Sequence, residues 1–179
     1  TKRDTMQALL NALSTLEKED GAGIQILLRP ADPSWRKEAS TVASKKRKGT
    51  DGKKGAGPWV RQFFEAFVKA PENKVGEKKE LSNLDQSILD AIDDKTRHPG
   101  YEVQIRVIAS SNISQRSQAI LSNMVATFSL FDAPGKNGFK YTPAKDIESF
   151  VTAYILRFFP HHKTRSILNS VELEKLFHF

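Results

Sequence analysis

Residues 24–29 read IQILLR and residues 101–109 read YEVQIRVIA, and these two stretches decide the fold. Both alternate aliphatic side chains with other residues, which is the pattern of a strand that buries one face. We therefore predict a strand over each stretch. Leu27, on the other face of the first strand, indicates cover on both sides. The side chains expected to point inward are Ile24, Ile26, Leu28, Val103, Ile105 and Val107.

Both predicted strands belong to a longer pattern that repeats at a shift of 79 residues. With this shift, residues 7–13 (QALLNAL) match residues 86–92 (QSILDAI), and Gly21 matches Gly100. Six positions are identical over residues 5–31. Duplication of one ancestral unit explains the match, and shared periodicity is the alternative.

Each copy predicts a helix, a strand and a second helix. One such unit is too small to bury both faces of its strand, so two units must lie side by side. We predict an α+β fold, in which two ferredoxin-like halves with pseudo-twofold symmetry pack their helices on a shared sheet. The expected divisions are a first half at 1–43, a basic flexible loop at 44–57, a helix and charged connector at 58–80, and a second half at 81–165.

The other helices follow from apolar residues at steps of three and four. We expect them at Ser34–Ser44, from Pro58, from Ser82, at Ser114–Phe128 and at Asp146–Phe158. A short strand is expected at Ser166–Asn169, and Ser170 is expected to cap a final helix.

Positive charge is concentrated in one segment. The chain carries 28 Lys and Arg against 21 Asp and Glu, a net charge of +7. Residues 45–54 alone contribute +5, and the surrounding SKKRKGTDGKKGAG segment is too polar to build a core. A solvated insertion, a nuclear-localisation-like tetrad and a contact with nucleic-acid phosphates or lipid headgroups all fit this composition. The candidate contact residues are Lys45, Lys46, Arg47, Lys48, Lys53 and Lys54.

The sequence contains few residue patterns that are typical of a catalytic, phosphate-binding or metal site. The chain has no Cys, which excludes disulfides, thiolate zinc sites and a Cys nucleophile, and fits a reducing compartment. Gly52-Lys53 lacks the glycine spacing and the Ser or Thr of a phosphate-binding loop. His161-His162 is a weak metal candidate, because no carboxylate stands at a ligand spacing from the pair. We therefore predict no enzyme activity, cofactor or metal for this chain; an enzyme with an unrecognised pocket is the least favoured alternative.

Several strings together resemble the region before the motor domain in bacterial conjugation and type IV secretion ATPases of the HerA/FtsK superfamily. They are QILLRP (25–30) followed by Trp35-Arg36, QIRVIA (104–109), Asn137-Gly138-Phe139 and ILNSVELEKLFHF (167–179). The most specific is an N-x-x-E-L-x-x-L-F/W-H segment, here Asn169, Glu172, Leu173, Leu176, Phe177 and His178.

The resemblance implies a non-catalytic N-terminal accessory domain, in the cytoplasm at the inner face of the membrane. Its expected partners are other subunits of a secretion or conjugation complex and the ATPase domain of its own parent chain. Residues 166–179 would then begin the linker to a C-terminal motor domain. The alternative is a nucleic-acid-binding module that uses the basic residues 45–54, with DNA or an anionic membrane surface as the partner.

Overall fold

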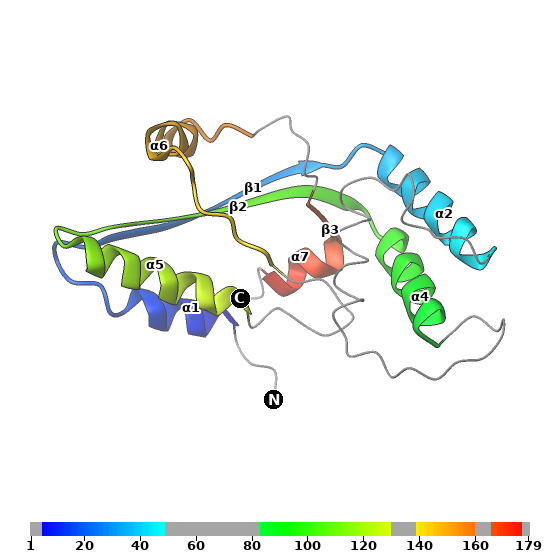
Figure 1. Ribbon diagram of the computed structural model, residues 1–179, viewed down its shortest axis with the longest axis horizontal. Coiled ribbons are helices and arrows are strands. Elements are labelled where there is room, and N and C mark those ends of the chain that lie inside the picture. The colour runs from blue at the N-terminus through cyan, green and yellow to red at the C-terminus, as the bar shows by residue number, and fades with distance from the viewer. Residues whose placement is uncertain (1–4, 49–82, 130–138, 160–165, 177–179) are drawn as a thin grey trace.

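A computed structural model describes residues 5–48, 83–129, 139–159 and 166–176 (Figure 1). Several predicted features lie outside these residues. They are the helix from Pro58, the connector up to residue 80, Lys53 and Lys54, the His161-His162 pair and His178.

The described residues form an α+β fold of six helices and one three-stranded antiparallel sheet, which confirms the predicted class. The first half contains α1 (Thr5–Leu13), β1 (Gly21–Pro30) and α2 (Ser34–Arg47). The second contains α4 (Asn83–Arg97), β2 (Gly100–Ser110) and α5 (Ser114–Phe128). The chain ends with α6 (Ile147–Ile155), β3 (Ile167–Asn169) and α7 (Ser170–Leu176).

The two long strands pair with each other along their whole length. The strand order is β1-β2-β3, and the β1–β2 register runs from Gly21 opposite Ser110 to Pro30 opposite Tyr101. Ile26 lies opposite Ile105, and the repeat predicts that these two residues are equivalent. Opposed residues share a face of a sheet. One face therefore carries the predicted inward side chains, and the other carries Gln25, Arg29, Glu102, Gln104 and Arg106.

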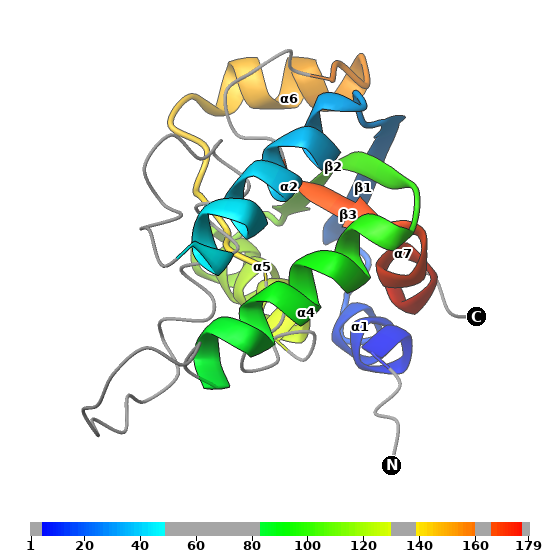
Figure 2. The same ribbon diagram turned by 90° about the vertical axis from the view of Figure 1, so that its right-hand side faces the viewer.

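The helices lie on both faces of the sheet and at one end of it. In Figure 1, α1 and α5 pack against each other below one end of the long ribbon, and α5 contacts β2. Helices α2 and α4 pack together beyond the other end, and α6 crosses the opposite face. Figure 2 looks along the strands and shows α6 above the sheet, with α1, α5 and α7 below it. The two faces of the sheet are thus covered by different helices: α1, α5 and α7 lie on one side, and α6 lies on the other.

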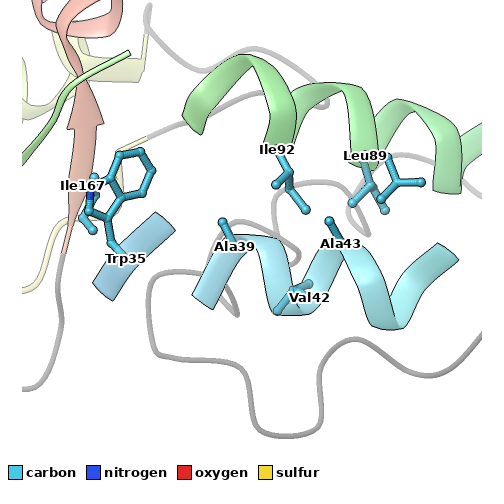
Figure 3. Close-up of a cluster of buried hydrophobic side chains, with 8 residues drawn as sticks. Trp35, Ala39, Val42, Ala43, Leu89, Ile92 and Ile167 are labelled. Carbon is cyan, nitrogen blue, oxygen red and sulfur yellow. The ribbon is translucent and has the colours of Figure 1, made fainter. Parts of the chain in front are cut away.

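A buried cluster joins α2 to α4 (Figure 3). Trp35, the second residue of α2, is 2% exposed. Ala39 and Ala43 follow at four-residue steps, and their small side chains let the two helices approach closely. The indole of Trp35 also lies against the backbone of Gly100. The other members of the cluster are Val42, Ile88, Leu89, Ile92 and Ile167. Met124 of α5 is fully buried under the sheet's apolar face.

Two local features differ from the sequence prediction, and one agrees with it. Helix α2 continues to Arg47, three residues beyond the expected end at Ser44, so part of the expected loop is helical. The short strand expected at Ser166–Asn169 forms as β3, which pairs with β2, and its residues Ile167 and Asn169 are buried. Asn169, rather than Ser170, caps α7 through its side chain. Within the described residues, no helix combines the length and apolar character needed to cross a bilayer.

Candidate functional site

The basic residues predicted as a contact surface are partly engaged inside the fold. Lys45, Lys46 and Arg47 form the last turn of α2, where cations are favoured by the helix dipole. The Lys46 Nζ lies 2.6 Å from the Asp85 Oδ1 of α4, and the Arg47 guanidinium lies 3.3 Å from the Asp93 carboxylate. Two of these cations thus meet carboxylates of the neighbouring helix. Lys48 is exposed at the helix end.

A polar network that the sequence analysis did not single out lies on the face of the sheet below α6. The Arg106 side chain on β2 is buried, with 5% of the residue exposed. Its guanidinium donates to the Ala153 carbonyl at 2.6 Å and to the Phe158 carbonyl, both at the end of α6. It also donates to the side-chain oxygens of Gln25 at 3.1 Å and Gln104 at 2.9 Å. All four acceptors are uncharged, and burial lowers the pKa of Arg106.

Both ends of α6 are fixed by hydrogen bonds. The Asp146 carboxylate accepts from the backbone N–H groups of Glu148 and Ser149, and bonds to Ser149 lower its pKa. At the other end, Arg157 adopts a left-handed conformation with φ 52°. The Phe158 N–H reaches the Ala153 carbonyl at 3.0 Å, which completes a Schellman-type end. Gln25 Nε2 adds a bond of 2.8 Å to the Tyr154 carbonyl. The helix is therefore held to the sheet mainly through its backbone.

An open groove of about 470 Å³ runs between β1 and the end of α6. Its lining residues are Ile24, Gln25, Ile26, Tyr154, Ile155 and Arg157. At Gly23 a Cβ atom would lie 2.5 Å from the Tyr154 hydroxyl oxygen, so glycine lets Tyr154 lie flat against the strand. Large apolar side chains are exposed along α6 and just after it: Ile147 (71%) at its start, and Ile155 (67%), Leu156 (72%) and Phe158 (55%) near the groove.

Two arginines join the segment α1–β1–α2 to the segment α4–β2–α5. Arg116 on α5 donates to both carboxylate oxygens of Asp20, at 3.0 and 2.7 Å, in the loop between α1 and β1. These bonds hold the pKa of Asp20 well below its usual range. Arg36 on α2 donates to the His98 carbonyl at 3.0 Å, in the loop between α4 and β2. Each half therefore secures a loop of the other.

The N-x-x-E string has a structural role in this fold. The Glu172 N–H bonds to the Asn169 Oδ1 at 2.9 Å, and the Asn169 N–H bonds to the Glu172 Oε2 at 2.8 Å, which is a reciprocal capping box. The same carboxylate pairs at 2.8 Å with the ammonium of Lys95, which is 4% exposed. Leu173 and Leu176 are buried. The string thus docks α7 against α4 and the sheet.

Of the six candidate basic residues, the structure describes Lys45, Lys46, Arg47 and Lys48, which lie together at the end of α2. Within residues 5–48, 83–129, 139–159 and 166–176, no three His, Asp or Glu residues are placed to share a metal ion. The groove and the Arg106 network were missed, although one signal was present: polar Gln25, Gln104 and Arg106 interrupt otherwise apolar strands. No protein-family model, curated protein or solved structure matches the chain.

Proposed function

We propose that the chain is a non-catalytic N-terminal accessory domain of a conjugative transfer or type IV secretion ATPase. It acts through protein–protein contacts with other subunits, in the cytoplasm beside the inner membrane. The resemblance of QILLRP, QIRVIA and the N-x-x-E string supports the family. The groove between β1 and α6, with the exposed apolar side chains beside it, supports a contact role. This groove is the observation that carries the proposal.

We further propose that the two halves arose by duplication and are related by a pseudo-twofold axis at Ile26 and Ile105. The shift of 79 residues makes these two residues equivalent, and they lie opposite each other in the sheet. The same operation exchanges the α1–α5 pair with the α4–α2 pair. It also exchanges the α1–β1 loop with the α4–β2 loop, and each loop accepts a bond from an arginine of the opposite half, although the bonded positions are not equivalent under the shift. These three correspondences favour duplication over shared periodicity.

Removing the domain from its parent protein tests the accessory role. An in-frame deletion of residues 1–179 is expected to abolish DNA transfer between cells while the purified remainder still hydrolyses ATP. The control is a Lys-to-Ala change in the motor's own phosphate-binding loop, which should abolish both. A parent reading frame without a Walker A motif, or unchanged transfer after the deletion, would contradict the proposal.

The alternative, a nucleic-acid-binding module, is tested without disturbing the fold. Changing Lys48, Lys53 and Lys54 to Gln leaves the Lys46–Asp85 and Arg47–Asp93 pairs intact. If these lysines bind phosphates, affinity for a short DNA duplex should fall, and the slope of log affinity against log salt should drop by about 3 between about 50 and 200 mM salt. Under the accessory-domain proposal, DNA binding is weak before and after the change, and DNA transfer is unaffected.

A further inference from the structure

The outer edge of β1 directs backbone N–H and C=O groups away from β2. The bond from the Ala31 N–H to the Gly100 carbonyl shows that odd-numbered residues of this strand face β2. The even-numbered residues Ala22, Ile24, Ile26 and Leu28 therefore direct their N–H and C=O groups outward. Within the described residues, none of these outward groups has a backbone or side-chain hydrogen bond. A long edge of this kind is a template for another strand.

The groove lies directly along this open edge. Ile24 and Ile26 line it from the strand, and Tyr154, Ile155 and Arg157 line it from α6. A strand added to β1 would therefore lie beneath the end of the helix. There the exposed Ile155 side chain offers an apolar contact while the strand's outward groups offer hydrogen bonds. Main-chain pairing beside side-chain pockets is the geometry of strand addition.

The charge around the groove indicates an acidic occupant. The Arg157 side chain is exposed and has no carboxylate partner among the described residues. The lining contains no Asp or Glu. An exposed cation in a lining without carboxylates favours a negatively charged side chain in the partner.

We propose that the edge of β1 and the end of α6 bind an extended, acidic segment of a partner protein by strand addition. The inference rests on the proposed protein-contact function and names the chemistry of the partner. A second copy of this chain fits less well. Antiparallel pairing of two β1 strands about Gln25 would bring a second Arg157 to the same groove, where like charges repel.

A synthetic peptide of alternating valine and glutamate, blocked at both ends, is the probe. Titrated into the labelled protein and followed by NMR, it should shift the backbone amides of Ala22, Ile24, Ile26 and Leu28 and slow their hydrogen exchange. The matched peptide of alternating valine and lysine should bind about tenfold more weakly, because attraction to Arg157 becomes repulsion. An N-methylated valine–glutamate peptide should not bind, because it cannot pair with the edge.

Two substitutions of Arg157 distinguish an effect of its charge on peptide binding from an effect on folding. Arg157→Glu should reverse the preference between the two peptides. Arg157→Gly should remove the preference without unfolding the protein, because glycine accepts φ 52° readily. Lys145→Glu, at an exposed lysine outside the groove lining, is the matched control and should keep the preference for the acidic peptide.

Equal affinity for both peptides, amide shifts away from β1, or an unchanged preference in Arg157→Glu would each overturn the inference. Protection of the same amides by dimerisation at high protein concentration, without peptide, would assign the edge to a second copy instead. The peptide titration does not involve the motor or DNA transfer. Its failure would leave the accessory-domain proposal standing, and failure of the deletion test would leave the peptide result standing.

Discussion

Gly100 lies so close to Trp35 that no side chain fits between them. A Cβ atom at Gly100 would lie 2.6 Å from Cζ2 of the indole, and that ring is 2% exposed and cannot move aside. At the residue scale, this contact fixes where β2 begins relative to α2. The sequence showed both residues, but their contact depends on how the two halves pack.

Gly100→Ala is expected to lower the free energy of unfolding by about 2 kcal/mol, because the added methyl group overpacks a buried site. Urea denaturation measures the change. The matched control is Gly21→Ala, at the equivalent position of the repeat. There the new atom meets only the Ser110 hydroxyl, which can rotate away, so little change is expected. Equal losses in the two variants would contradict this account of Gly100.

Asp20 gives the protein a pH dependence in acid. Hydrogen bonds from Arg116 and from the Glu17 N–H lower its pKa in the folded state. The unfolded chain, with an ordinary aspartate pKa of about 4, therefore binds more protons as the pH falls. The stability that Asp20 contributes is complete above that pH and is lost as the pH falls toward the folded-state pKa.

Asp20→Asn should therefore flatten the rise of stability between about pH 2 and 5, and lower stability at neutral pH. Thermal unfolding across this pH range measures both effects. Asp94→Asn, at an exposed aspartate of α4, should retain the steep wild-type profile. An Asp20→Asn profile as steep as the wild type would show that the Arg116 contact contributes nothing to acid stability.

At the scale of elements, α6 depends on one buried arginine. None of its residues is buried, so packing alone holds it weakly, and the bonds from Arg106 and Gln25 to its last carbonyls supply the attachment. Hydrophobic periodicity predicted this helix correctly. Its apolar stripe indicated burial, whereas the structure leaves Ile147 and Ile155 mostly exposed.

Arg106→Leu should cost about 3 kcal/mol, because it leaves several polar groups without their charged donor. Arg106→Lys should recover only part of the lost stability, because one ammonium cannot reach the acceptors on both α6 and β1. Hydrogen exchange in α6 should accelerate in both variants. Arg97→Leu, at an exposed position of α4, is the control and should change stability by less than about 0.5 kcal/mol. Unchanged exchange in α6 would contradict its attachment through Arg106.

The limits of element prediction have physical causes. Local patterns located β1, β2 and α5 well, because each alternates apolar and polar residues at its own period. The extra turn of α2 was missed, because its lysines are favoured by the helix dipole and by carboxylates of α4. The Arg106 network was missed because its bonds to α6 and to Gln25 join residues 47 or more positions apart. The polar residues Gln25, Gln104 and Arg106 in the strands were visible, but local patterns do not show which distant groups they bond.

At the scale of the whole molecule, Ile26 and Ile105 lie at the centre of the β1–β2 register. Under the proposed duplication they occupy equivalent surroundings. Ile26→Ala and Ile105→Ala should then each lower the free energy of unfolding by about 2 kcal/mol. Because the side chains are cross-strand neighbours, the double variant should lose less than the sum. Clearly unequal single losses, measured in urea, would contradict equivalence of the two sites.

Under the proposed duplication, the arginine contacts between the halves have a consequence for ancestry. Arg36 holds a loop of the second half, and Arg116 holds a loop of the first. A half-length ancestor with one copy of this unit would carry both the arginine and the loop to which the arginine binds. Two such molecules would pair, with the arginine of each bound to the loop of the other. The dimer would have the same arrangement of four helices and two strands. Gene fusion would then have replaced a dimer whose formation depends on concentration with two halves that are covalently joined.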